Sequence, residues 1–494
     1  MIDWFLDKGI KMKKVIVILL MLAIIVTGYN VFNFNIYNYI DKEYEELIAK
    51  DLNNIDPDQI DSYDINVKFD PVNKSCEIKQ KIRYINKEDV SLKQIYFHLY
   101  PNAFKKNSMF IGSARRQDDG YEPGYIELKH IKVNGWELSY KITGSDDTLL
   151  LLNLPEPLLP KESLNISIDY LLKIPNIPHR FGYKNSTFNF GNWYPIAAVY
   201  DDEGWNKSEY YQIGDPFYSD VSNYNITIEA PAQYTIASSG KVISIETKDG
   251  KKIWSIKSQL MRDFAWVTSD NFKIQTYNTK DTQIKLYHLT DEKPVIKYAV
   301  NVAKSTLKVF NQAFGQYPYG HISIVETNFL GGGMEYPGLV YINTDRFNSN
   351  RRSYLSEYIT HELAHQWWYA VVGNDQVDEA WLDEGFATYS QVIYREETSG
   401  RDSAENLYLF LMNNYGTKST NKKLESPVTD FNSWDEYNSV AYGKGASVLH
   451  EIKEKYGSEK LYELLDTYYN RFKFKNATTT DFFNIYQEVL GIEY

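Results

Sequence analysis

Two histidines and a glutamate in the second half of the chain carry the first chemical signal. His361, Glu362 and His365 spell His-Glu-x-x-His in a stretch whose residue pattern is typical of a helix. Residues four apart on a helix lie on the same face, so both imidazoles point the same way. Two convergent imidazoles provide half of a tetrahedral zinc site, and a glutamate beside them can act as a base toward water. The motif therefore predicts zinc-dependent hydrolysis.

A catalytic zinc site needs a third protein ligand, and a downstream glutamate can supply it. Glu384 lies 19 positions after His365, in the segment 381–389, which we expect to form a second helix. A return of this length can bring the carboxylate back over the first helix. Taken alone, Glu384 would be an ordinary helix glutamate, and the two histidines could belong to a surface helix. Together they predict a His₂Glu metal site.

The segments around these residues predict a mainly helical part of the chain. Residues 294–314 have helical spacing and end before a glycine, with a proline close behind. Residues 321–327 have the pattern of a strand, and residues 331–337 form a glycine-rich edge. Helical patterns dominate from there to the end. We therefore expect residues 275–494 to form a zinc metallopeptidase catalytic domain.

The preceding part of the chain has the pattern of β-strands. Residues 63–69, 164–170 and 224–230 alternate apolar and polar side chains, and turn signals lie between such runs. We expect residues 61–274 to form an antiparallel β-rich domain with one buried face. The predicted fold class is therefore α+β and multidomain, with the β-rich domain first and the helical domain second.

The start of the chain carries the only membrane signal of the sequence. Four lysines within residues 1–14 precede an apolar run, and residues 15–32 have the length of a signal sequence or of a tilted membrane span. The lysines place the N-terminus in the cytoplasm. We expect a single-pass anchor in the cell membrane, with the catalytic domain on the extracytoplasmic side. A tether over residues 33–60 follows, with a short acidic helix around residues 42–51. Secretion after signal cleavage is the alternative.

Composition and charge exclude several classes of function. The 494-residue chain is 43% hydrophobic and 24% charged, which is a globular composition. A net charge of −12 argues against a nucleic-acid partner, which would call for a basic surface. The single cysteine, Cys76, excludes an internal disulfide and a Cys₄ zinc site.

Four motifs in the same order resemble peptidase family M1, a family of gluzincin aminopeptidases. The first is the zinc motif itself, with its third ligand after a further 18 residues. Residues 332–336 (Gly-Gly-Met-Glu-Tyr) resemble the family's Gly-Ala-Met-Glu-Asn, and residues 383–387 (Asp-Glu-Gly-Phe-Ala) resemble its Asn-Glu-Gly-Phe-Ala. Residues 440–449 resemble the segment with its catalytic tyrosine. The β-rich part, notably residues 214–220, is similar to the family's saddle-like N-terminal domain.

The resemblance implies a thermolysin-like catalytic domain that holds one Zn²⁺ per chain. The implied ligands are His361, His365 and Glu384. Glu362 would accept a proton from water as general base and later deliver it to the leaving amine. Tyr442 would donate a hydrogen bond to the oxyanion that forms on the scissile carbonyl.

The resemblance also implies how peptide substrates bind. Glu335 would hold the free α-amino group of the substrate, which makes the enzyme an aminopeptidase that releases N-terminal residues. A carboxylate in a dry cleft selects a charged N-terminus, because a blocked one leaves it unpaired. Gly332, Gly333 and Met334 would line the edge along which the peptide backbone lies.

Two departures from the family pattern keep other functions open. Tyr336 stands where the family has Asn, and residues 188–195 offer only Asn189 and Asn192 in place of a second amine-binding Glu or Gln. These substitutions favour a zinc endopeptidase on the same scaffold as one alternative. A catalytically silent peptide-binding module is the other.

The second departure concerns the end of the sequence. Family members commonly continue into a large helical domain, whereas this sequence stops at Tyr494, about 110 residues after Glu384. We therefore expect a short form without the C-terminal helical domain, with an open active site or a partner that covers it.

Overall fold

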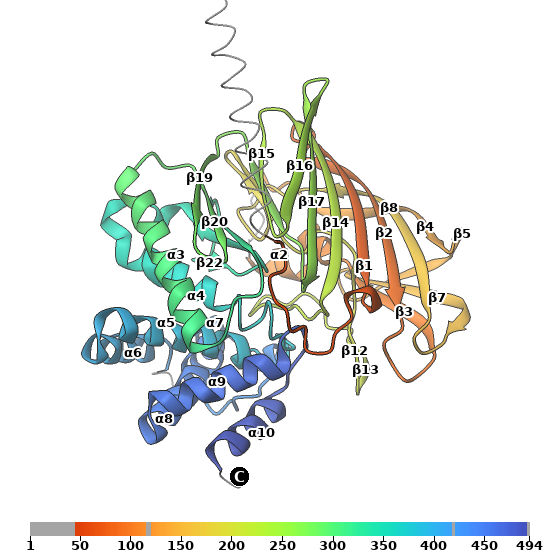
Figure 1. The fold of residues 1–494 in the computed structure, drawn as a ribbon. Coiled ribbons are helices and arrows are strands. Elements are labelled where there is room, and N and C mark those ends of the chain that lie inside the picture. Colours follow the sequence, from red (N-terminus) through yellow and green to blue (C-terminus); the bar gives the residue numbers. More distant parts are fainter. Residues whose placement is uncertain (1–44, 115–119, 417–419, 492–494) are drawn as a thin grey trace, which may run out of the picture. The chain divides into compact units, whose positions relative to one another are not determined.

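The computed structural model describes residues 45–114, 120–416 and 420–491 (Figure 1). The expected membrane segment, residues 15–32, and the N-terminal residues 1–14, which we expect to be cytoplasmic, lie outside the described residues. Within the described ranges, no helix has both the length and the apolar character needed to cross a membrane.

An eight-stranded sheet is the main sheet of the β-rich domain. Its strand order is β16-β17-β14-β1-β2-β8-β4-β5. The strands are β1 (Ser62–Asp70), β2 (Ser75–Ile85), β4 (Tyr125–Val133), β5 (Trp136–Glu137), β8 (Ser163–Lys173), β14 (Ser222–Pro231), β16 (Lys241–Lys248) and β17 (Lys251–Met261). Neighbours pair antiparallel except β1 and β14, which run parallel. Side chains of β1 alternate between buried and exposed, which is the pattern of a sheet with one face in the core.

Smaller sheets cover the buried face and extend it toward the catalytic domain. One has the order β11-β3-β7-β6, another β15-β18-β10-β9, and β12 pairs with β13. Their bounds are β3 (Leu92–His98), β6 (Tyr140–Thr143), β7 (Leu149–Leu158), β9 (Phe181–Lys184), β10 (Thr187–Phe190), β11 (Ile196–Ala197), β12 (Tyr200–Asp201), β13 (Gly204–Trp205), β15 (Thr235–Ser238) and β18 (Trp266–Ser269). Short helical turns are η1 (Pro57–Gln59), η2 (Tyr100–Phe104) and α2 (Met109–Ala114).

A five-stranded sheet and a group of helices form the catalytic domain. The sheet has the order β19-β20-β21-β23-β22. Its strands are β19 (Lys273–Asn278), β20 (Gln283–His288), β21 (His321–Thr327), β22 (Gly333–Met334) and β23 (Leu339–Asn343). β20, β21 and β23 are parallel, and the glycine-rich β22 is an antiparallel edge. The expected domain boundary after residue 274 lies inside β19, which pairs with β20 and so belongs to the sheet of the catalytic domain.

The helices follow one another from α3 to the end of the described chain. They are α3 (Lys293–Ala313), α4 (Arg352–Ala364), α5 (Trp381–Ser399), α6 (Arg401–Tyr415), α7 (Trp434–Tyr437), the π-helical segment η6 (Asn438–Lys444), α8 (Gly445–Tyr456), α9 (Ser458–Phe472) and α10 (Thr479–Leu490). Single turns are η3 (Thr344–Arg346), η4 (Ser349–Arg351) and η5 (Val428–Asp430). Figure 1 shows α3 and α4 beside the five-stranded sheet and α8, α9 and α10 farther from it, and α4 and α5 are in contact.

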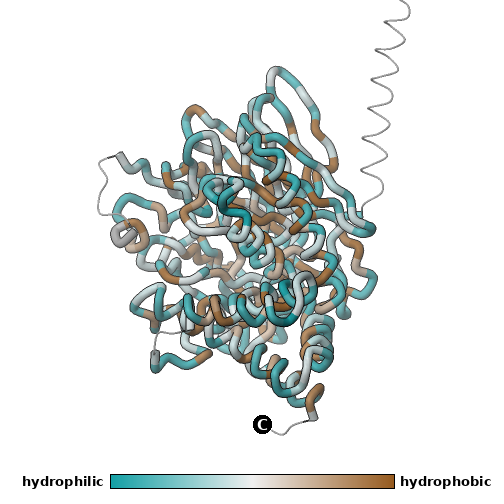
Figure 2. Tube along the Cα trace, turned by 90° about the vertical axis from the view of Figure 1, so that its left-hand side faces the viewer, coloured by the Kyte–Doolittle hydropathy of each residue, from teal (hydrophilic) through white to brown (hydrophobic). Residues whose placement is uncertain are grey.

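Hydrophobic and hydrophilic stretches are interspersed along the trace in Figure 2. This distribution fits elements that each bury one face, as β1 and α3 do. The α+β prediction is therefore confirmed, with a β-rich domain followed by a mainly helical one.

The segment before β1 differs from the expected tether. Residues 45–51 are not helical, so the short acidic helix is wrong over this range. Instead, the backbone N–H groups of Ile48 and Ala49 both donate to the carbonyl of Pro318, at 2.8 and 3.2 Å. Asp51 forms an ion pair with Lys473 at 2.8 Å. An isolated short helix is marginal in water, and backbone pairing with the catalytic domain replaces it here.

Candidate active site

The three predicted metal ligands form a compact triangle. Nε2 of His361 lies 3.2 Å from Oε2 of Glu384, Nε2 of His365 lies 3.4 Å from the same oxygen, and the two nitrogens are 3.3 Å apart. Tetrahedral zinc with bonds of about 2.0–2.1 Å places its ligand atoms roughly 3.3–3.4 Å apart. The donor set and its spacing therefore fit one Zn²⁺.

Neighbouring groups hold these ligands in position. Nδ1 of His365 hydrogen-bonds to the carbonyl of Trp368 at 3.1 Å, which leaves Nε2 for a metal ion. The backbone N–H of Glu384 donates to Asp383 at 2.8 Å, and Gln376 donates to the other oxygen of that carboxylate at 2.5 Å. Burial acts to raise the pKa of Glu384, but the adjacent imidazoles of His361 and His365 lower it well below its usual value. The third ligand is therefore a charged carboxylate.

A close contact between two helices places Tyr442 over the metal ligands. A Cβ atom on Gly385 of α5 would lie 2.6 Å from Cα of Gly445 at the start of α8, so these helices approach this closely only because both residues are glycine. The π-helical segment before α8 then directs the phenol of Tyr442 at Glu384, with a hydrogen bond of 2.6 Å. Its ring also stacks on His361, with the centroids 5.8 Å apart.

Glu362 faces the glycine-rich edge of the sheet. A Cβ atom on Gly333 would lie 2.3 Å from Oε1 of Glu362, so any larger residue would displace the carboxylate. Burial raises the pKa of Glu362 to about 8. The carboxyl oxygens of Glu362 and Glu335 and a ring nitrogen of His365 lie within 4.8 Å of one another.

Glu335 and a second carboxylate lie together at one end of the site. Oε1 of Glu335 is buried and has no hydrogen-bond partner among the described residues. A carboxyl oxygen of Asp215 lies within 4.8 Å of oxygens of Glu335 and Glu384. Burial, followed by the charge of Asp215, raises the pKa of Glu335 well above its usual value. Arg180 pairs with Asp215 at 2.7 Å and is itself almost fully buried.

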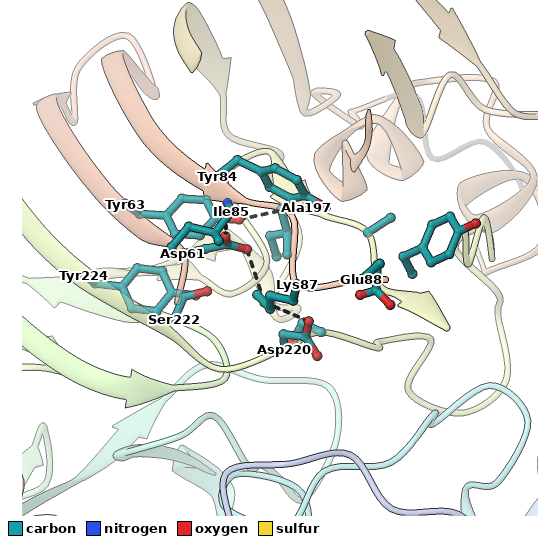
Figure 3. A pocket seen from close by; sticks show the side chains of 14 residues that line it. Asp61, Tyr63, Tyr84, Ile85, Lys87, Glu88, Ala197, Asp220, Ser222 and Tyr224 are labelled. Atoms are coloured by element: carbon teal, nitrogen blue, oxygen red, sulfur yellow. Dashed lines mark hydrogen bonds and ion pairs between the residues drawn. The ribbon is translucent and has the colours of Figure 1, made fainter. Parts of the chain in front are cut away.

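Asp215 is the site residue that sequence reasoning missed. It lies in residues 214–220, which indicated only the saddle-like domain. The segment is also fixed at its far end, where Lys87 lies between Asp220 at 3.0 Å and Asp61 at 3.4 Å (Figure 3). Asn476 of the catalytic domain donates to Asp220 at 2.9 Å. These contacts hold the far end of the segment, and Arg180 pairs with Asp215 itself.

Asn189 and Asn192 do not line the cleft. Asn189 donates to the carbonyl of His179 at 2.9 Å. Asn192 donates to Asp263 at 2.8 Å and accepts a hydrogen bond of 2.7 Å from the phenol of Tyr336. Tyr336, which stands where the family motif has Asn, is therefore a buried residue that connects the two domains through this hydrogen bond.

A cleft of about 610 Å³ joins these groups. All nine residues predicted from the sequence line it: Gly332, Gly333, Met334, Glu335, His361, Glu362, His365, Glu384 and Tyr442. Arg180 and Asp215 line it as well. The arrangement brings the candidate metal triangle, the carboxylate of Glu362, the phenol of Tyr442 and the carboxylates of Glu335 and Asp215 to one space.

Comparisons with known proteins agree with this geometry. Residues 298–493 match the family model of the peptidase family M1 domain. Aminopeptidase 2 of Candida albicans is 28% identical over 253 residues, which cover 47% of this chain and 26% of that protein. Endoplasmic reticulum aminopeptidase 2 of Homo sapiens is 24% identical over 353 residues, covering 67% and 36%. The chain thus spans about a third, or less, of the length of these relatives.

Solved structures show the same fold. An M1 zinc metallopeptidase from Deinococcus radiodurans superposes with a TM-score of 0.63 at 18% identity, over 87% of this chain and 91% of that one. A mutant of the Deinococcus enzyme bound to a Tyr-Ser-Ala substrate gives 0.63 at 16% identity, over 88% and 91%. The β-rich and the helical domain both take part in this similarity.

Proposed function

The chain belongs to peptidase family M1, and we propose that it is a zinc-dependent aminopeptidase that releases N-terminal residues from peptides. One observation carries the proposal: two buried carboxylates, Glu335 and Asp215, lie next to the metal triangle at one end of the cleft. A metal triangle alone supports hydrolysis, and the carboxylate pair supports hydrolysis at a free amine.

The metal site comprises His361, His365 and Glu384. Zinc supplies Lewis acidity, which polarises a carbonyl group and makes a nearby water more acidic. The spacing of the three donor atoms and the hydrogen bond that orients His365 support this choice of metal.

Glu362 is the proposed general base. Its carboxylate lies within 4.8 Å of His365 and faces the edge where a peptide backbone would lie. In this position it accepts a proton from the attacking water and later returns that proton to the amine of the leaving product.

Tyr442 is the proposed donor to the oxyanion. Burial, followed by the charge of Glu384, raises the pKa of Tyr442 well above its usual value, so the phenol keeps its proton and can donate. A preorganised donor stabilises the charge that develops on the carbonyl oxygen more than it stabilises the substrate.

Glu335 and Asp215 are the proposed receptors for the substrate's α-ammonium group. An ammonium gives the unpartnered oxygen of Glu335 a charge-assisted hydrogen bond and relieves its repulsion with Asp215. A peptide with a blocked N-terminus supplies neither, and leaves the buried Oε1 of Glu335 without a hydrogen-bond partner among the described residues.

A panel of fluorogenic amino-acid amides, measured with and without a chelator, tests the proposal. We expect chelator-sensitive release of the fluorophore from free amino acids and little from their N-acetyl forms. Equal cleavage of free and acetylated substrates would support a zinc endopeptidase instead. Full zinc occupancy without hydrolysis of any peptide would support a silent binding module.

The location of the enzyme is a separate proposal that rests on the sequence alone. We propose that residues 15–32 anchor the chain in the cell membrane and that the catalytic domain lies on the extracytoplasmic side. Fractionation of untreated cells should then recover the enzyme with the membranes, and protease added to intact cells should degrade the catalytic domain. Recovery of activity from the medium would favour secretion after signal cleavage.

A further inference from the structure

Two glycines align the edge of the sheet with the zinc-binding helix. A Cβ atom on Gly333 would meet the carboxyl group of Glu362, and one on Gly332 would lie 1.7 Å from Cε1 of Tyr358. The step from Gly333 back to Gly332 along the glycine-rich edge therefore corresponds to about one turn back along α4, from Glu362 to Tyr358. The edge and the helix form two sides of the same channel.

This alignment gives the cleft a direction. The carboxylate of Glu335 lies near His365, at the C-terminal end of α4. A peptide whose amine binds Glu335 and whose backbone follows the glycine edge passes Glu362 and then reaches Tyr358. The part of the substrate beyond the scissile bond therefore lies against the N-terminal half of α4.

Glu357 is the charged side chain at this far end of the cleft. It lies one turn before His361 and lines the cleft with the aromatic rings of Tyr354, Tyr358 and Tyr415. Its backbone carbonyl accepts a hydrogen bond from Gln391 at 3.0 Å. Its half-buried carboxylate has no hydrogen-bond or ion-pair partner in the described ranges of the chain.

The charges around the cleft leave Glu357 without a balancing group. Five carboxylates line the cleft (Asp215, Glu335, Glu357, Glu362 and Glu384), and the guanidinium that lines it, Arg180, is paired with Asp215. Two further arginines in this region, Arg346 and Arg395, are not among the lining residues. The guanidinium of Arg346 stacks on the rings of Tyr354 and Tyr358, 5.8 and 4.8 Å from their centroids. Burial raises the pKa of Glu357, and the charge of Arg395 opposes this shift only in part.

We propose that Glu357 selects a lysine or arginine side chain at the residue that follows the scissile bond. For an aminopeptidase this is the second residue of the substrate, so the inference rests on the proposed function. A half-buried carboxylate in a cleft that the ring of Tyr415 also lines offers a cation both an ion pair and a ring face. The preferred substrates are therefore peptides with a free N-terminus and a basic second residue.

Tripeptides of the form Ala-X-Ala, with X as Lys, Met or Glu, test this specificity. We expect kcat/KM for Lys to exceed that for Met by about fivefold or more, and Glu to be disfavoured. Glu357→Gln should bring the Lys-to-Met ratio close to one. Glu451→Gln, which removes an exposed glutamate from α8, is the matched control and should keep the wild-type ratio.

Binding provides a second readout that needs no turnover. The same tripeptides are titrated into Glu362→Gln and into the double variant that also carries Glu357→Gln. The peptide with Lys should bind more tightly than the peptide with Met to Glu362→Gln, and the two should have similar Kd values for the double variant. A wild-type ratio near one, or a ratio that survives Glu357→Gln, would overturn the inference. If the wild type hydrolyses no peptide, the proposed function fails, while the Kd ratio still decides the specificity.

A further substrate decides the case in which Glu357→Gln does not fold. Norleucine at X keeps the carbon chain of lysine and removes the charged nitrogen, so kcat/KM of the wild type for this peptide should be close to the value for Met. A norleucine peptide that is hydrolysed as fast as the Lys peptide would show that Lys is preferred for its length and not for its charge, and would overturn the inference.

Discussion

The phenol of Tyr442 donates a hydrogen bond of 2.6 Å to Oε1 of Glu384, although the two residues are 58 positions apart. The other oxygen of this carboxylate faces His361 and His365. One carboxylate therefore links the metal triangle to the phenol, and the contact between α5 and α8 at Gly385 sets the distance.

Tyr442→Phe removes the donor and leaves the ring in place. We expect kcat to fall by about 10²–10³ while KM changes little, because the lost hydrogen bond acts mainly in the transition state. Zinc content measured on the purified variant should remain one per chain. Wild-type turnover in this variant would exclude Tyr442 as the oxyanion donor.

Glu362→Gln removes the base and keeps the shape of the side chain. The metal ligands are untouched, so zinc content should be unchanged, whereas kcat should fall by roughly 10²–10⁴. Metal analysis and steady-state kinetics on the same sample check both parts. A variant that retains most turnover would show that another group takes the proton.

Asp215→Asn tests the carboxylate pair beside the metal. We expect KM for substrates with a free N-terminus to rise by about tenfold, because a charge-assisted contact to the ammonium becomes a neutral one. The discrimination between free and N-acetyl substrates should shrink accordingly. Asp202→Asn, at an exposed position in the same domain, should leave both values unchanged. An equal loss with both kinds of substrate would indicate that Asp215 has a structural role.

His98→Phe should change how stability depends on pH. Burial lowers the pKa of His98 to about 4, and neither ring nitrogen has a partner among the described residues. The unfolded chain takes up a proton below about pH 6.5 while the folded protein stays neutral, so this residue makes the fold less stable as pH falls. A phenylalanine at position 98 can stack on Tyr100 as the imidazole does, and its side chain does not titrate.

The measurement is the free energy of unfolding of wild type and variant between pH 7 and 4. The difference between them should grow in favour of His98→Phe as pH falls, by at most about 1.4 kcal/mol per pH unit. A difference that stays constant over this range would mean that His98 does not titrate differently in the folded and unfolded chains.

The sequence by itself determined the order of the two domains and predicted the candidate metal site. His-Glu-x-x-His predicts convergent ligands because helix periodicity is a local property, and alternating strands predict a sheet with one buried face for the same reason. The glycines around Glu335 and Glu384 could be recognised, but not the contacts that they permit.

Only the tertiary structure decided which acidic residues accompany the metal ligands. Asp215 and Glu357 look like any loop or helix carboxylate in the sequence, and no local pattern indicated that Asn192 accepts a hydrogen bond from Tyr336 between the two domains. Residue type and local spacing determine which atoms are available to a site. The distance between Asp215 and Glu335 depends on how segments 120 positions apart pack together, and no local pattern encodes it.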